Sequence, residues 1–378
     1  MAVLFIDGFD HYTTADILKK WSSLVASTYL VNPPSIVSNG VNGGKALGNL
    51  VTMVKYLPSN HNTLIVGCAL CVEGPIPIDY KSVLAFMDNG TTQISLSIDI
   101  TYHIVIRAGD TLHGQILGRS INPISPIGWS YVELKVLFDT LVGTVTARIN
   151  EVECLSLVNQ NTSPSTNPSA NGLMLGGINY TLVAPNYVYT PDMVLTTAKI
   201  DNLYLSDTSG PAPTNDFLGV CNISVQVPVA DGAHLQLTPS SGTAHFPLVA
   251  ELFPDNATHN SSATSGDIDS YKLSSVIPQL IQTVFAVQVN AAASTDGIGP
   301  TQLSTLVHSG GVDALGPSTI VGPNQQYVSY IGDIIAGHVL IANPDQQYVS
   351  QVFNTDPSKN VRWTTSSVNV MEAGVKIV

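Results

Sequence analysis

Apolar residues along this chain fall into short runs that alternate with polar residues, and this pattern predicts strands. In Ile94–Ile100 every second residue is isoleucine or leucine, and the residues between them are Ser or Asp, which is the two-residue period of a half-buried strand. Similar short apolar segments occur at 63–72, 102–108, 131–138, 143–150, 172–177 and 199–205. Helical spacing is clearest in Ala15–Trp21, which follows the potential cap Thr13–Thr14. The chain is therefore predicted to be all-β.

The first half of the chain has the strand spacing of an antiparallel β-sandwich. Strand centres about 8–12 residues apart, separated by polar turns, are typical of sandwiches and jelly rolls. Residues 139–142 have the length of a hairpin connection, and the polar segment 159–171 reads as a loop. The Pro/Gly-rich segment 206–216 reads as an interdomain linker. We predict a β-sandwich at 1–208, a linker at 209–216, and a second, mostly-β domain for assembly contacts at 217–378.

The second half is less regular. Its apolar stretches are 217–228 and 277–293; the first part of the latter is compatible with a helix. Positions that fit a buried strand in that stretch are Val284, Ala286, Val287 and Val289. The Asn/Ser/Thr-rich segment 254–269 is predicted to be a long exposed loop. The sequence Gln-Gln-Tyr-Val-Ser occurs at 325–329 and at 346–350. The two copies either mark two equivalent strands of a hairpin or occur by chance.

Composition narrows the class of protein. Of the 378 residues, 44% are hydrophobic and 11% are charged, so the chain can bury large cores and is not disordered as a whole. A net charge of −13 with 14 Lys and Arg residues disfavours nucleic acid and anionic membranes as partners. The mean hydropathy of +0.23 suggests apolar surface left over for contacts between copies, so we expect a homo-oligomer.

The apolar runs do not predict a targeting segment. The N-terminal run stops at Asp7, which is too short for a secretion signal. No uninterrupted apolar window reaches the length of about 18 residues that a membrane span needs. We therefore expect neither export nor membrane insertion.

The four cysteines do not form a recognisable metal or disulfide motif. Cys68 and Cys71 lie within the predicted strand 63–72, where residues three apart point to opposite faces. A second Cys-x-x-Cys that would complete a zinc site is missing. We interpret these cysteines as buried free thiols.

Catalytic chemistry has little support in the sequence. The nine histidines are scattered without a metal-binding spacing; His103 and His113 could meet across a hairpin, but two exposed histidines are the simpler interpretation. Asp7 and Asp10 are candidates for a Ca²⁺ pair or for paired acids, although shaping the turn after a first strand explains them as well. We therefore predict no catalytic residue, no cofactor and no metal, and hence no enzyme.

Aromatic residues offer the best candidates for ligand binding. Trp129 and Tyr131 alternate and so share one face of a strand, as do Tyr187 and Tyr189. Such pairs on a concave sheet could stack on sugars, although the same pattern also fits a core. These four residues are the candidate glycan-binding positions.

Several short motifs occur in an informative order. The chain opens with Phe5–Tyr12 (FIDGFDHY), followed by Lys20–Trp21. Next come the paired segments Trp129–Val136 (WSYVELKV) and Gly143–Asn150 (GTVTARIN). The remaining motifs are 200–207 (IDNLYLSD), 215–219 (NDFLG), 228–232 (PVADG), 363–364 (WT) and 372–378 (EAGVKIV).

In this order the motifs resemble a group of tailed-phage virion structural proteins with a laminin-G/concanavalin-like N-terminal jelly roll. Glu151 stands where that pattern has a turn glycine, so we expect a looser hairpin here. The resemblance touches the whole length of the chain and implies a lectin-like sandwich without catalytic residues. It leaves open whether the protein sits on the head or the tail.

The leading hypothesis is a non-enzymatic virion component, such as a head decoration, fibre or tail-associated protein, that binds other virion proteins. Such a protein is made in the host cytoplasm and needs no export signal. The alternative is a carbohydrate-binding adhesin of the virion that recognises host-surface glycans. A glycan depolymerase ranks last, because it requires a carboxylate pair in a cleft for which the sequence has no motif.

Overall fold

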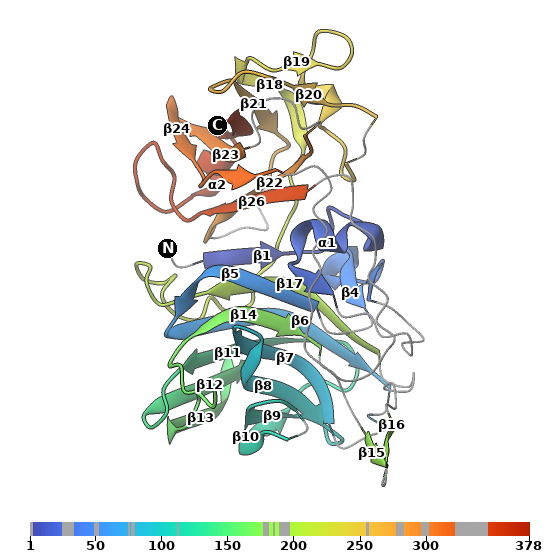
Figure 1. The fold of residues 1–378 in the computed structure, drawn as a ribbon, viewed down its shortest axis with the longest axis vertical. Coiled ribbons are helices and arrows are strands. Elements are labelled where there is room, and N and C mark those ends of the chain that lie inside the picture. The colour runs from blue at the N-terminus through green and yellow to red at the C-terminus, as the bar shows by residue number, and fades with distance from the viewer. Residues whose placement is uncertain are drawn as a thin grey trace.

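Alternating apolar and polar residues form antiparallel strands, so the fold is all-β as predicted. The computed structural model describes residues 3–24, 34–48, 53–74, 76, 80–111, 113–176, 181–183, 186–188, 197–254, 257–276, 283–295, 302–321 and 347–378, with 181–183 and 186–188 described by their backbone alone. Figure 1 shows the sandwich of the first half and the smaller sheets of the second half stacked along the long axis.

Two antiparallel sheets make up the first half. The first sheet has the order β13-β12-β11-β6-β17-β4-β3, and β1 also pairs with β17. Its strands are β1 (Val3–Asp7), β3 (Ser35–Val37), β4 (Ala46–Gly48), β6 (Thr63–Glu73), β11 (Trp129–Leu137), β12 (Gly143–Ile149), β13 (Val152–Gln160) and β17 (Thr197–Ser206). The second sheet has the order β10-β9-β8-β7-β14-β5-β2. Its strands are β2 (Ser23–Leu24), β5 (Met53–His61), β7 (Tyr80–Asp88), β8 (Thr91–Asp99), β9 (His103–Ala108), β10 (Gln115–Pro123) and β14 (Ala170–Leu175).

The second half contains smaller sheets. The largest has the order β18-β21-β27-β23-β24, with β25 also on β23. Its strands are β18 (Pro228–Leu235), β21 (Ile268–Leu273), β23 (Gln302–Ser309), β24 (Val312–Leu315), β25 (Thr319–Ile320) and β27 (Glu372–Ile377). The two-stranded sheets are β22 (Val287–Ala293) with β26 (Gln347–Phe353), β19 (Thr238–Pro239) with β20 (Asn260–Ser261), and β15 (Thr181–Val183) with β16 (Asn186–Val188). The short helices are η1 (Thr14–Asp16), α1 (Ile17–Lys20), η2 (Val41–Gly43), η3 (Phe246–Leu248) and α2 (Thr365–Val368).

The sandwich core follows directly from the strand pattern. Ile94, Leu96 and Ile98 of β8 are fully buried between the two sheets. The strand is not half-buried as expected, however, because Ser95 on its other face is also covered. The polar loop after β13 covers Gln93 of the same strand, since backbone carbonyls of Asn167 and Ser169 accept hydrogen bonds from the Gln93 amide. The predicted polar loop thus packs on the sheet.

Most of the predicted elements are confirmed with small shifts at their ends. The segments predicted in the first half correspond to β6, β8, β9, β11, β12, β14 and β17. The helix predicted at 15–21 is a turn of 3-10 helix followed by α1, and Asp16 accepts hydrogen bonds from the backbone and hydroxyl of Thr13. Residues 139–142 join β11 to β12 in a hairpin, as expected.

Predictions for the second half need corrections. Strand β22 begins at Val287, so Val284 and Ala286 precede it. Segment 254–269 is not wholly a loop, because it contains β20 and the start of β21, where Asp269 is fully buried. Residues 325–329 and 277–282 lie outside the described residues, whereas 347–350 belong to β26. The domain limits at 208 and 217 remain predictions.

None of the helices in the described residues is both long and apolar enough to span a membrane.

Candidate functional site

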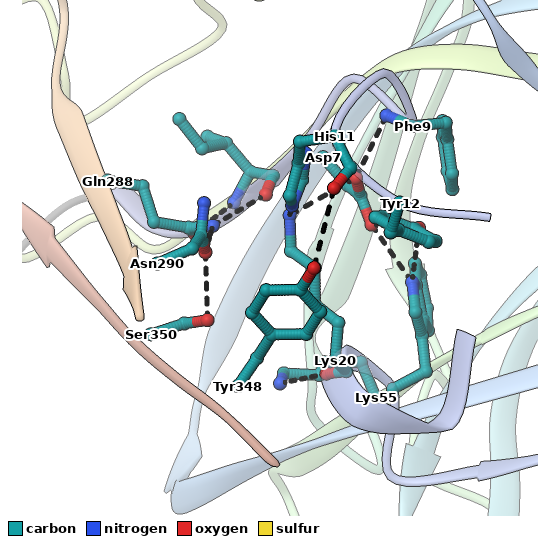
Figure 2. A network of polar contacts seen from close by, with 12 residues as sticks. Asp7, Phe9, His11, Tyr12, Lys20, Lys55, Gln288, Asn290, Tyr348 and Ser350 are labelled. Atoms are coloured by element: carbon teal, nitrogen blue, oxygen red, sulfur yellow. Dashed lines mark hydrogen bonds and ion pairs between the residues drawn. The ribbon is translucent and has the colours of Figure 1, made fainter. Parts of the chain in front are cut away.

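The first strand ends in a buried carboxylate. Asp7 closes β1 and has no exposed surface. Its Oδ1 accepts a hydrogen bond from the backbone N–H of Phe9 (3.0 Å) and contacts Lys20 Nζ (3.2 Å). Its Oδ2 accepts from the Tyr12 hydroxyl (2.8 Å) and from Trp21 Nε1 (2.9 Å). Each carboxylate oxygen therefore has two donors, which is the condition under which a buried charge is tolerated. We call Asp7 with its four donor residues the Asp7 network (Figure 2).

Short-range sequence order positions these donors. The chain turns at Gly8 and Phe9, where Phe9 has a positive φ of 58°, so Tyr12 returns toward Asp7. Helix α1 then places Lys20 and Trp21 beneath the same carboxylate. Phe5 packs edge-on against Trp21, with ring centroids 5.3 Å apart. The FIDGFDHY motif and the Lys20–Trp21 pair thus form one structural unit.

Burial shifts the pKa values of the ionisable groups around Asp7. Lys20 Nζ lies 3.2 Å from His11 Nε2, so this nitrogen accepts and the ring proton resides on Nδ1. Burial, reinforced by the Lys20 charge, lowers the pKa of His11 to about 3. Burial alone would raise the pKa of Asp7, but Lys20, His11 and the hydrogen-bond donors hold it below its ordinary value. Burial also lowers the pKa of Lys55, which donates to Lys20 O, to about 8.

Two amide side chains from the second half cover the open edge of β1. The Gln288 side chain accepts from Ile6 N–H (3.0 Å) and donates to Ile6 C=O (3.1 Å). The Asn354 side chain likewise accepts from Val3 N–H (3.0 Å) and donates to Val3 C=O (3.1 Å). Among the strands that the structure describes, β1 pairs with β17 alone, so these amides replace a neighbouring strand and satisfy backbone groups that an edge strand leaves open. We call Gln288 and Asn354 the amide clamps.

An aromatic contact completes the junction between the halves. Tyr348 of β26 is 7% exposed and belongs to the same core cluster as the sandwich. Its ring lies 5.9 Å from that of His11, near perpendicular, and its hydroxyl reaches the His11 carbonyl. Figure 2 shows Tyr348 and Gln288 approaching the β1 turn from the second half. A cavity of about 1430 Å³ adjoins this junction, with His11 and Lys20 among its lining residues.

Asp7 is poorly suited to act as a base or as a metal ligand, because both of its carboxylate oxygens already accept hydrogen bonds or ion-pair contacts. A general base or a metal ligand needs a free lone pair within reach of the reacting group. Asp7 is fully enclosed and already accepts from four donors. Asp7 shapes the turn after the first strand, as the simpler interpretation expected, because it accepts from the Phe9 N–H. Asp10 instead accepts from the distant Lys45 N–H at 2.6 Å, so it does not serve this turn. The network instead fixes the turn after β1, against which Gln288, Asn354 and Tyr348 of the second half pack.

The candidate glycan-binding residues lie in different surroundings. Trp129 and Tyr131 share one face of β11, as predicted, but Tyr131 is 5% exposed and its hydroxyl donates to the Asn202 carbonyl at 3.1 Å. Trp129 is partly buried in the same cluster. Tyr189 and the side chain of Tyr187 lie outside the described residues. The burial of Tyr131 does not favour stacking on a sugar.

The segment after the predicted linker covers this face of β11. Phe217, Leu218 and Cys221 pack on the cluster that contains Tyr131. Beneath them Glu133 is fully buried and accepts from the Tyr204 hydroxyl (2.6 Å) and from Gly219 N–H (2.9 Å). Burial raises the pKa of Glu133. This segment therefore packs against the first sandwich rather than only leading into the second half.

The open edges of the two sandwich sheets lie together and carry exposed apolar residues. β10 is the edge of one sheet and β13 of the other, and the two strands are in contact. Gly118 permits this approach, since a Cβ there would lie 3.0 Å from Leu155 and Leu157. The exposed apolar residues of these two strands are Ile116 (48%), Ile121 (81%), Val152 (61%) and Val158 (62%). We call these four residues the edge patch.

Two other sequence expectations are resolved in the described residues. Cys68 and Cys71 are buried free thiols on β6, as predicted, and burial raises the pKa of Cys68 to about 12. His103 contacts Thr101 and Arg119, whereas His113 lies 3.3 Å from Asp110.

Sequence reasoning missed the roles of Gln288 and Asn354. Each is a single amide in an unremarkable stretch, and its partner lies more than 280 residues away in the chain. The motif at Phe5–Tyr12 was a usable signal for the Asp7 network, but its clamps carry no pattern of their own. The edge patch was also missed, because alternation alone does not tell an edge strand from a central one.

No protein-family model matches the sequence, and no curated protein matches it. Among solved structures, the chain is similar to an endo-β-1,4-glucuronan lyase from the fungus Trichoderma reesei, with 13% identity and a TM-score of 0.37 over 49% of this chain and 90% of that one. It is similar to the alginate lyase Aly36B, with 12% identity and a TM-score of 0.31 over 46% and 83% of the two chains. A third likeness is to the CBM2 module of the evolved Dit of Lactobacillus casei BL23 phage J-1, with 11% identity and a TM-score of 0.35 over 54% and 95%. At these scores the likenesses carry no functional conclusion.

Proposed function

We propose that this protein is a non-enzymatic structural component of a phage virion that binds other virion proteins through the edge patch. The observation that carries the proposal is that both sandwich sheets end side by side in open strands with exposed isoleucine and valine. Unpaired strand edges with apolar side chains are surfaces at which another chain can add. The order of the sequence motifs supports the assignment to a phage particle.

The edge patch has only part of the protection that is common for edge strands. Natural edge strands are blocked by charged side chains, proline or β-bulges. β10 (QILGRSINP) and β13 (VECLSLVNQ) each carry one charged residue, Arg119 and Glu153, and each shifts register against its neighbour, but neither contains lysine and the proline of β10 stands at its last position. Isoleucine and valine side chains remain exposed beside these features. By contrast, the open edge of β1 is closed by the amide clamps. The open edge of β1 is thus covered internally, whereas the edge formed by β10 and β13 exposes apolar side chains that another chain can contact.

Rigidity suits this role. Domains joined by a linker move relative to one another unless their interface is extensive. Here the amide clamps connect the halves through partly buried hydrogen bonds, and Tyr348 packs in the core of the sandwich. Asp7, His11 and Lys20, whose pKa values are shifted near the junction, then serve this connection and not catalysis.

The edge patch can be tested by charge insertion. Replacing Ile121 and Val158 with lysine places two cations on the exposed edge without disturbing the core. The matched control is Val370→Lys, because Val370 is 74% exposed on the second half. We expect the double variant to keep the wild-type melting temperature but to be absent from purified particles, while the control is incorporated. Normal incorporation of the double variant would refute the edge patch as the assembly surface.

The alternative is a carbohydrate-binding adhesin of the virion, and Trp129 is the observation that favours it. Trp129 is the one candidate whose side chain is described and partly exposed. A glycan screen with wild-type protein and with Trp129→Ala tests this alternative. Glycan binding that depends on Trp129 would establish it, and the absence of any binding would leave assembly as the function.

A further inference from the structure

Two histidines and an aspartate meet on the second half, away from the junction and from the edge patch. They are His234 of β18, His308 of β23 and Asp313 of β24. One ligand atom from each lies within 4.8 Å of the other two. This grouping is not visible in the sequence, because His234 and His308 are far apart along the chain and follow no metal-binding spacing.

The β23–β24 hairpin fixes two of the three residues. Gly310 and Gly311 both have positive φ, 55° and 81°, as a two-residue hairpin turn requires. The turn places His308 directly opposite Asp313 in the strand register. Their side chains meet at 2.6 Å, from His308 Nδ1 to Asp313 Oδ1.

A displaced part of β18 delivers the third residue. The pairing of β18 with β21 is interrupted between Asp231 and Leu235. In this interval Ala233 N–H donates to Glu372 Oε2 of β27, so the backbone lies over the face of the sheet. Gly232 makes this possible, since a Cβ there would lie 2.4 Å from Glu372 Oε2. The PVADG motif therefore carries β18 across the sheet and brings His234 to the hairpin.

The resulting geometry is close to that of a three-ligand metal site. His234 Nε2 lies 3.1 Å from Asp313 Oδ2, and the two imidazole rings stand perpendicular with centroids 5.4 Å apart. In a tetrahedral zinc site with bonds of about 2.0–2.2 Å, neighbouring ligand atoms are about 3.4 Å apart. The His234–Asp313 contact of 3.1 Å is near this distance, whereas the His308–Asp313 contact of 2.6 Å is a hydrogen bond that has to lengthen when the ion enters.

We propose that His234, His308 and Asp313 form a binding site for a divalent transition metal of the zinc class. Two imidazoles and a carboxylate suit zinc, whereas calcium and magnesium require mostly oxygen ligands. The side chains are 28%, 19% and 34% exposed, respectively, so an ion can enter from solvent. The three protein ligands leave a fourth position open for water or for a group from another molecule. A bound ion would cross-link β18, β23 and β24, and this site departs from the sequence expectation of no metal.

The test is titration of the full chain, stripped with a chelator, with Zn²⁺ and with Co²⁺. We expect one Zn²⁺ per chain by calorimetry, a rise in melting temperature, and visible absorption bands when Co²⁺ occupies a site of low coordination number. Ca²⁺ and Mg²⁺ should produce none of these changes. Failure of wild-type protein to bind Zn²⁺ at this stoichiometry would overturn the proposal.

Variants separate this site from adventitious binding to other histidines. Asp313→Asn and His308→Ala should each weaken Zn²⁺ binding at least about tenfold, because loss of even a residue that only orients a metal ligand typically costs about 10–100-fold. His113→Ala is the matched control, because His113 also faces an aspartate but has no third ligand among the described residues. Circular dichroism checks folding, and His234→Gln provides a second route if one variant does not fold. Equal Zn²⁺ affinity in wild type and Asp313→Asn would refute the site.

Discussion

Asp7→Asn is the substitution that most directly tests the Asp7 network. It keeps the shape of the side chain but removes the charge and one acceptor oxygen. All four partners of Asp7 approach as donors: Phe9 N–H, Tyr12 OH, Lys20 Nζ and Trp21 Nε1. An amide N–H₂ in place of Oδ1 or Oδ2 therefore faces donors and cannot satisfy them.

The expected cost follows from the burial of the ion pair. The Lys20 and Asp7 side chains are 1% and 0% exposed, respectively, so the ammonium cannot turn to water when its partner is lost. Removing one partner of a buried ion pair costs about 3–5 kcal/mol. By the same reasoning the double variant with Lys20→Met should lose less than the sum of the two single variants, because both charges are then gone.

Urea unfolding followed by tryptophan fluorescence measures this cost, since Trp21 belongs to the network. Asp216→Asn is the control: Asp216 pairs with Lys135 at 3.0 Å, but its side chain is 56% exposed, and such surface pairs contribute at most about 1 kcal/mol. A loss for Asp7→Asn no larger than that for Asp216→Asn would refute the reasoning. So would strict additivity of Asp7→Asn and Lys20→Met.

Three further predictions concern the junction and the core. Burial lowers the pKa of His11 to about 3; because the unfolded chain takes up a proton near its pKa of about 6.5, stability should fall with decreasing pH between these values, by up to about 1.4 kcal/mol per unit. Urea unfolding at several pH values should show a shallower fall for His11→Gln, and an unchanged slope would contradict the burial of this imidazole. Gln288→Leu should cost about 1–3 kcal/mol by leaving both backbone groups of Ile6 unpaired, and wild-type resistance to unfolding and proteolysis would argue against the clamp. Gly67→Ala should cost about 1–3 kcal/mol by overpacking, because a Cβ there would lie 2.2 Å from the Tyr204 ring; an unchanged melting temperature would show that the ring can move away.

The strands of the first half could be predicted because their cause is local. The alternation in Ile94–Ile100 reflects the pleat of one strand, and β8 lies within one residue of that segment at its C-terminal end. The burial of Gln93 could not be predicted, because its amide binds a loop some seventy residues further along the chain. Alternation of apolar and polar residues predicts a single strand, whereas the burial of its second face depends on segments that are distant in the sequence.

The site was predictable only where its residues are neighbours in sequence. The turn from Asp7 to Tyr12 is compact, so its motif could be recognised before the structure. Gln288 and His234 owe their roles to tertiary placement, Gln288 beside an open strand and His234 on a displaced segment of β18. Trp129 and Tyr131 share a face as alternation requires, but their cover by Phe217 depends on where the following segment packs.

The most direct test of the proposed function is to search for the protein on purified particles of a phage whose genome carries this sequence. Intact particles are labelled with an antibody against this chain and imaged, and their peptides are identified by mass spectrometry. The account predicts peptides of this protein in every preparation and label at regular, repeated positions on the head or the tail. Particles that are complete and infectious but contain neither label nor peptide would contradict it.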